Sequence, residues 1–180
     1  MSFKLFSLVA LLAGSAAATL CPGASLVSTK TIHVNGIDLT QTIHSCPGVS
    51  KRQTTTSSSA ISNVCTTPCN TVCSSATGIL PPIQADCDTI ANSFIILESE
   101  VNSPFFEVAS GTQQTISFGT CSFFFQNLTP GTLAECWTDL GTNGEAAAAA
   151  CFPPNQPFFP EGLCASADPD LTWNVGVSHS

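Results

Sequence analysis

Cysteine limits how this 180-residue chain can fold more than any other residue, because the chain holds ten of them. Cys21 and Cys46 precede residue 52, and eight more follow it. Those eight are Cys65, Cys69, Cys73, Cys87, Cys121, Cys136, Cys151 and Cys164. An even number of cysteines in a short chain predicts a disulfide framework, whose connectivity the sequence leaves open. We expect no metal site, because no Cys-x2-Cys pair exists and His179 is the only histidine after residue 52.

The first residues have the pattern of a secretory signal peptide. Lys4 precedes a short apolar run at 5–13, and small residues follow at 14–18. This order of charged, apolar and small residues predicts a signal peptide at 1–18, cut between Ala18 and Thr19. No run in the chain is long enough to span a bilayer as a helix. We therefore expect a secreted, extracellular protein without stable membrane insertion.

A second processing signal follows at Lys51-Arg52, the only dibasic pair in the chain. Polar residues 53–59 come directly after it, and an exposed polar segment is easily reached by proteases. A cut after Arg52 would make 19–52 a propeptide and 53–180 a mature single domain, ordered from about residue 65. The alternative is that the pair belongs to an ordinary charged loop.

Charge is divided unevenly by this predicted cut. All four basic residues lie at or before position 52, whereas eleven of the twelve acidic residues follow it. The predicted mature part therefore carries a net charge of −11. Such a surface excludes nucleic acid as a partner, because that binding needs cations to neutralise phosphates. It also opposes binding to anionic lipid.

Three segments have helical signals. Apolar residues at three- and four-residue spacing predict an amphipathic helix over 83–100. Pro68 predicts the start of a short helix that carries Cys69 and Cys73 on one face. A capping-box pattern predicts a helix from Thr132, ended by glycines at 141 and 144, with another turn or two in the alanine-rich segment that follows.

Four segments have strand signals, namely 105–108, 114–118, 120–125 and 171–177. The last strand alternates cleanly, and the phenylalanines of 123–125 point to both faces, which predicts a central position. Prolines make 152–160 a loop. The sum predicts the α+β class: a disulfide-rich α/β sandwich in which helices pack on an antiparallel sheet of about four strands.

Catalytic groups are scarce after residue 52. That part has no Lys, Arg or Tyr, and its single histidine lies one residue from the end. A Ser–His–Asp or Cys–His arrangement would depend wholly on that histidine, so we expect no enzyme, no catalytic residues and no cofactor. Paired carboxylates, which glycoside hydrolysis requires, stay open as an alternative. The candidates are Asp86, Glu107, Glu135 and Asp139.

Sugar binding fits the composition better, because neutral glycans are held by aromatic faces and by polar side chains. The candidate ligand-binding residues are Trp173, Asn174, Asp168, Asp170, Asn155, Phe158 and Phe159. Core packing is the favoured interpretation for Trp173 and for Trp137, whereas Phe158 and Phe159 lie in a proline-rich loop where exposure is expected. The sequon at Asn127 predicts glycosylation, although Pro130 follows it directly.

Several short patterns resemble a known family of small secreted proteins. They are Asp86-Cys87, Phe106 to Val108, Gly119 to Asn127, Cys136 to Leu140, and Cys151. Together they are similar to the Y-three-type glycan-binding family of mushroom-forming fungi, over residues 65–180. The resemblance implies a secreted, disulfide-bonded α/β sandwich that binds glycans and acts in defence. It assigns no sugar contacts to positions of this chain.

A second resemblance is more distant, to fungal necrosis-inducing effectors related to small killer toxins. The cysteine cluster at 65–73 and the proline-rich loop fit that family less well. We therefore expect an acidic, lectin-like protein whose partners are cell-surface or cell-wall glycans. A secreted effector or toxin and a hyphal-surface structural protein are the alternatives. The identity of the sugar and a homodimeric state stay open.

Overall fold

The computed structural model of the chain describes residues 21, 23–47, 61–75, 80–154 and 159–180. Within them lie ten strands and two helices. The strands are β1 (Ser25–Val34), β2 (Ile37–Ser45), β3 (Ser62–Asn63), β4 (Cys69–Ser74), β5 (Phe105–Val108), β6 (Thr112–Phe118), β7 (Cys121–Asn127), β8 (Leu133–Cys136), β9 (Glu161–Ser166) and β10 (Trp173–His179). The helices are α1 (Gln84–Glu100) and α2 (Trp137–Cys151). The predicted signal peptide and Lys51-Arg52 lie outside the described residues.

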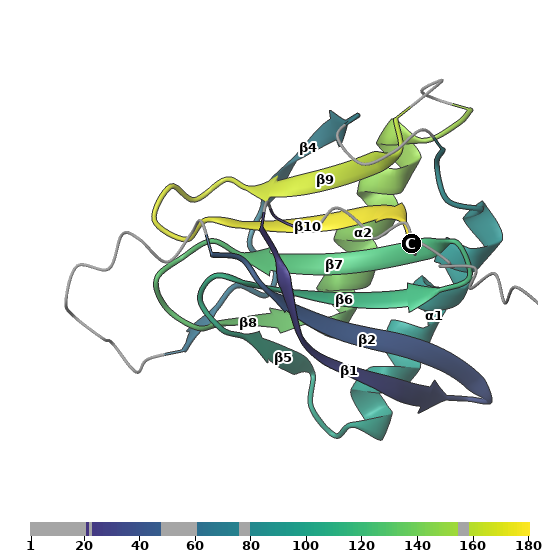
Figure 1. The fold of residues 1–180 in the computed structure, drawn as a ribbon, viewed down its shortest axis with the longest axis horizontal. Coiled ribbons are helices and arrows are strands. Elements are labelled where there is room, and N and C mark those ends of the chain that lie inside the picture. The colour runs from purple at the N-terminus through teal and green to yellow at the C-terminus, as the bar shows by residue number, and fades with distance from the viewer. Residues whose placement is uncertain (1–20, 22, 48–60, 76–79, 155–158) are drawn as a thin grey trace, which may run out of the picture.

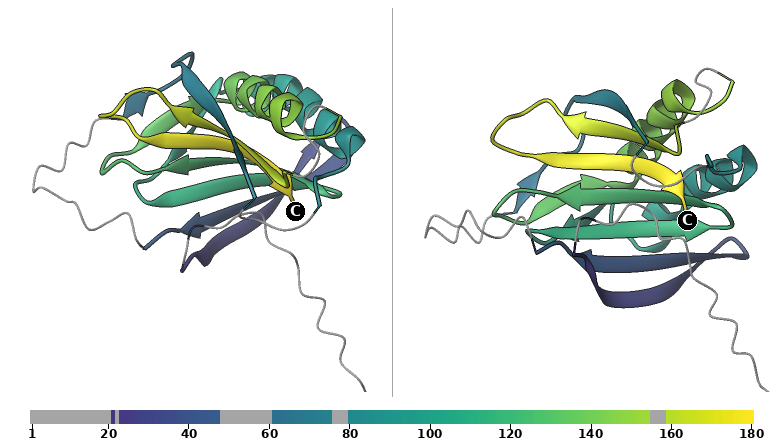
Figure 2. Two further views of the ribbon diagram at one scale, coloured as in Figure 1. Left: turned by 90° about the horizontal axis from the view of Figure 1, so that it is seen from above. Right: turned by 45° about the horizontal axis from the view of Figure 1, so that its top comes forward.

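A seven-stranded antiparallel sheet in the order β1-β2-β6-β7-β10-β9-β4 forms most of the fold. Both helices lie on one face of this sheet (Figures 1 and 2). A smaller sheet, β3-β8-β5, lies beside them. The protein is therefore mostly β, and the predicted sandwich with about four strands is wrong. The prediction failed because it omitted the strands before residue 75 and β8 and β9.

The N-terminal strands β1 and β2 form a hairpin within the segment predicted to be a propeptide. Asn35 and Gly36, between the strands, both have positive φ values, 47° and 80°. An Asn-Gly pair with that conformation makes a two-residue turn whose twist matches a hairpin. The hairpin then pairs through β2 with β6, which makes it the outer edge of the large sheet. The segment is thus an integral part of the fold.

Two helix predictions are corrected. The segment after Pro68 is strand β4, not a short helix. Residues four apart share a face in both structures, so Cys69 and Cys73 could not distinguish them. The helix expected to run from Thr132 to the glycines at 141 and 144 instead begins at Trp137, after strand β8, and continues to Cys151. A Cβ on Gly144 would lie 2.4 Å from the ring of Phe123, so this glycine permits close helix–sheet packing rather than ending the helix.

Other sequence predictions agree with the structure. Helix α1 begins one residue after the predicted start, and four predicted strands correspond to β5, β6, β7 and β10. Strand β7 is central, and its three phenylalanines are buried. A continuous series of ring contacts fills the space between the large sheet and the helices: Phe123, Phe94, Trp137, Phe106, Phe125 and Trp173, with neighbouring centroids 4.3–6.1 Å apart.

All ten cysteines form disulfides, which confirms the framework predicted for the eight cysteines after residue 52 and adds a fifth bond before it. The pairs are Cys21–Cys46, Cys65–Cys136, Cys69–Cys164, Cys73–Cys151 and Cys87–Cys121. Three of them connect the short segment 65–73 to the C-terminal third of the chain. The set is typical of proteins that fold in an oxidising compartment. The described part of the chain has no helix long and apolar enough to cross a membrane.

Candidate functional site

Four of the residues predicted to bind sugar, Asp168, Asp170, Trp173 and Asn174, lie at the start of β10 or in the connection that precedes it. Trp173 is fully buried and stacks on Phe125, so it presents no ring face to a ligand. Asn174 donates a hydrogen bond to Gln126 across the neighbouring strand. Asp168 and Asp170 form a surface turn, in which the Asp168 carboxylate accepts a hydrogen bond from the Asp170 backbone N–H.

The proline-rich loop contributes only one described residue to that predicted set. Phe159 is partly buried and packs against the hydrophobic core. Asn155 and Phe158 lie outside the described residues. Of the two phenylalanines predicted to be exposed, Phe159 is therefore only partly so, and the exposure of Phe158 stays a prediction.

Three of the four candidate hydrolase carboxylates, Asp86, Asp139 and Glu107, differ in their surroundings. Asp86 accepts hydrogen bonds from the backbone N–H and hydroxyl of Thr120, which lower the pKa of its carboxyl group and fix the turn between β6 and β7. Asp139 accepts a hydrogen bond from the backbone N–H of Thr66. Glu107 is exposed on β5. Each of the two aspartates thus has a structural partner in the fold.

Glu135 is the unusual member of this group. Its side chain is 1% exposed on β8, and neither carboxyl oxygen has a hydrogen-bond partner among the described residues. Burial, and secondarily the negative charge of Asp139, raises the pKa of Glu135 to about 9. The group is therefore a neutral acid at pH 7. A carboxyl group in that state can donate a proton, but it cannot act as a nucleophile or base.

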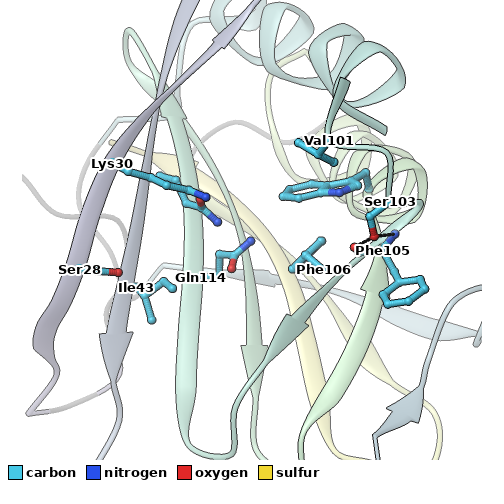
Figure 3. Close-up of a pocket in the computed structure, with 10 residues that line it drawn as sticks. Ser28, Lys30, Ile43, Val101, Ser103, Phe105, Phe106 and Gln114 are labelled. Atoms are coloured by element: carbon cyan, nitrogen blue, oxygen red, sulfur yellow. Dashed lines mark hydrogen bonds between the residues drawn. The ribbon is translucent and has the colours of Figure 1, made fainter. Parts of the chain in front are cut away.

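A pocket of about 410 Å³ lies on the helix-bearing side of the large sheet, near its N-terminal edge. One wall comes from the hairpin, with Ser28 and Lys30 on β1 and Gln41 and Ile43 on β2. The opposite wall and the floor come from β6, from the chain between α1 and β5, from β5 itself and from the first residue of α2. They are lined by Gln114, Val101, Ser103, Phe105, Phe106 and Trp137. Figure 3 shows Lys30 and Ile43 across the space from Val101 and Ser103.

The floor of the pocket holds three polar side chains that are almost completely buried. Gln41, Gln114 and Trp137 are 6%, 4% and 5% exposed. In the described part of the structure, Gln41 Oε1, Gln114 Nε2 and Trp137 Nε1 each lack a hydrogen-bond partner. An unpaired buried polar group costs about 1–3 kcal/mol of folding free energy, so three such groups around one pocket destabilise the folded protein.

The pocket combines these polar groups with apolar surface. Phe106 packs against Trp137, with ring centroids 4.3 Å apart, and Ile43 and Val101 add aliphatic surface. Because Trp137 also stacks on Phe94, it offers the pocket no free ring face. Lys30 is exposed at the rim and is the only Lys or Arg among the described residues.

Sequence reasoning missed this pocket for identifiable reasons. Trp137 was correctly read as a core residue, and the structure shows that a core residue can also present a donor to a pocket. Gln41 and Gln114 are polar residues on the inward face of β2 and β6. The only sequence signal for this is that they stand at positions of the strands where the two-residue alternation places inward-facing side chains. The hairpin residues of the pocket also lie in the predicted propeptide, which a mature domain of 53–180 would not contain.

Two further groups of residues do not form sites. The sulfur atoms of Cys65 and Cys136 lie close to the Asp139 carboxylate, but these cysteines are bonded to each other and so cannot act as thiolate ligands. Asn127 is fully buried, and its amide donates to the carbonyls of Val108 and Gly131. The folded protein therefore does not present the predicted glycosylation site at its surface.

Comparison with known proteins gave no match to a protein-family model, to a curated protein or to a solved structure. The two family resemblances described above therefore stay predictions. The geometry of the pocket carries the functional argument by itself.

Proposed function

We propose that the protein is a secreted, lectin-like protein. It binds a glycan in the pocket between the N-terminal hairpin and the facing wall, which is formed by the chain after α1, by β5 and by the start of α2. One observation carries this proposal: three buried side chains that line the pocket, Gln41, Gln114 and Trp137, each hold one polar atom that has no hydrogen-bond partner among the described residues. The groups include both an acceptor and donors, which matches sugar hydroxyl groups because each hydroxyl both donates and accepts.

The size and lining of the pocket support the same proposal. A volume of about 410 Å³ lies in the range of small-molecule sites and can hold one or two sugar rings. The apolar surface of Phe106 and Ile43 suits the C–H face of a pyranose. Lys30 at the rim can additionally pair with a carboxylate, so sugars that contain uronic acids belong in the test set.

The test is a glycan array probed with the full-length protein, containing neutral and uronic-acid saccharides. We expect binding to a limited set of saccharides. Substituting Gln114→Leu keeps the side-chain volume but removes the donor, so we expect at least a tenfold loss of affinity, equivalent to about 1.4 kcal/mol. The measurement is isothermal titration with the best saccharide of the array.

Gln113→Leu is the matched control. Gln113 is the preceding residue on β6, is 0% exposed and also has an unpartnered side-chain oxygen, but it points to the opposite face of the sheet. Its substitution should leave the affinity unchanged. Absence of binding to every saccharide at high protein concentration would contradict the proposal. Leakage of lipid vesicles by the same preparation would then favour the toxin alternative.

A further inference from the structure

The disulfides divide the described chain into two parts that no covalent cross-link joins. Cys21–Cys46 closes the N-terminal hairpin on itself. The other four disulfides all lie between residues 65 and 164, and no cysteine is left free. A single backbone cut between residues 47 and 61 would therefore produce two chains held together only by non-covalent contacts.

Those contacts include a complete strand pairing. Strand β2 pairs with β6 over six residue pairs, from Thr40 opposite Ser117 to Ser45 opposite Thr112. The backbone N–H of Cys46 adds a hydrogen bond to the carbonyl of Gly111. Strand β6 has seven residues and now lies inside the sheet, between β2 and β7. Without the hairpin, it would become an exposed edge strand. Such an open edge favours aggregation, whereas the bound hairpin covers it.

Apolar side chains of the hairpin belong to the same core as the rest of the protein. Val34 and Leu39 are both 0% exposed, and Ile32 and Ile37 pack against the core as partly buried residues. Departure of the hairpin would expose these side chains together with Ile116 of β6, which is now 0% exposed. Burial of apolar surface therefore opposes dissociation of the two parts.

Strand pairing and a disulfide also hold the hairpin in its bound conformation independently of the rest of the protein. Its two strands pair over most of their length, and the Cys21–Cys46 disulfide joins their open ends. A segment that is already closed in its bound shape loses less conformational freedom on association, which strengthens binding.

From these observations we propose that processing after Arg52 does not release residues 19–52. The hairpin remains bound as a second, non-covalently attached chain, and the partner that it fits is the edge of β6 in the 53–180 chain. The mature protein is then a two-chain molecule. It keeps Lys30, and it keeps the pocket wall formed by Ser28, Lys30, Gln41 and Ile43.

The test begins with the purified full-length secreted protein, treated with a dibasic-specific protease. Mass spectrometry under denaturing, non-reducing conditions should then show two separate chains. Native mass spectrometry and gel filtration at micromolar concentration should show one complex that contains both. A variant with a site-specific protease sequence in place of residues 50–54 supplies the cut if Lys51-Arg52 is not accessible.

Adjacent positions on β2 give a matched pair of variants. Leu39 is buried against the core and Thr40 is exposed on the opposite face, so Leu39→Asp should weaken retention of the hairpin at least tenfold and Thr40→Asp should not. The milder Leu39→Ala provides the same comparison if the aspartate variant does not fold.

Elution of the 53–180 chain without the hairpin, in the wild-type cut protein, would overturn the proposal. So would a disulfide that joins the two chains, or equal retention in the Leu39 and Thr40 variants. None of these readouts involves a saccharide, so the proposal can fail while glycan binding stands, and the reverse also holds.

Discussion

Glu135→Gln is the substitution whose effect on stability can be worked out most directly from the structure. Burial holds the pKa of Glu135 at about 9, compared with 4.5 for the free side chain. The folded protein therefore keeps this proton over a range in which the unfolded chain releases it. A group with a raised folded-state pKa gives its full stability below the unfolded value and loses it as the pH rises.

The size of the loss follows from the two pKa values. Each pH unit above 4.5 costs about 1.36 kcal/mol, so at pH 7 the loss is about 3 kcal/mol relative to pH 4. Glutamine has nearly the same shape as a protonated glutamate but has no proton to lose. The variant should therefore resemble the wild type at pH 4 and be more stable by about 3 kcal/mol at pH 7.

The assay is urea unfolding at pH 4, 5.5 and 7 with the disulfides intact, and the quantity compared is the difference in free energy of unfolding between variant and wild type. Using the difference removes the contributions that the other carboxylates make to both proteins. Glu107→Gln is the control, because it makes the same substitution at an exposed carboxyl group on the neighbouring strand β5. A Glu135→Gln difference that stays constant from pH 4 to pH 7 would refute the reasoning.

Two further predictions concern packing and the hairpin. A Cβ on Gly162 would lie 2.7 Å from the backbone oxygen of Ala147, so Gly162→Ala should destabilise the protein by about 1–3 kcal/mol, whereas Gly131→Ala, with nothing within 4 Å, should be tolerated in the same thermal unfolding measurement. Replacing Cys21 and Cys46 together with serine should lower the free energy of unfolding by about 3 kcal/mol and weaken retention of the cut hairpin. Unchanged retention by native mass spectrometry would show that the disulfide does not preorganise the hairpin.

The parts of the fold that sequence could predict are those with a strong local pattern. Helix α1 has a clear apolar periodicity, and β10 alternates cleanly. The disulfide content also followed from the cysteine count. These signals depend on residues near each other in sequence, so they survive without knowledge of the tertiary structure.

The parts that failed depend on distant contacts. Whether Cys69 and Cys73 lie on a helix or a strand is decided by pairing with β9, almost a hundred positions away. Gly144 lies within a helix, at a position where a Cβ atom would overlap the ring of Phe123 on the sheet. The pocket joins residues of the hairpin to Trp137, and no local pattern connects them.

The disulfide topology also has a consequence for synthesis of the chain. In an oxidising compartment, Cys21 and Cys46 can pair early in synthesis, because only 25 positions separate them. Cys65, Cys69 and Cys73 must stay reduced until residues 136, 151 and 164 have arrived, since their partners are 71 to 95 positions away. Throughout that interval three neighbouring thiols can pair wrongly with one another. Production of this protein should therefore depend on a disulfide isomerase far more than its small size suggests.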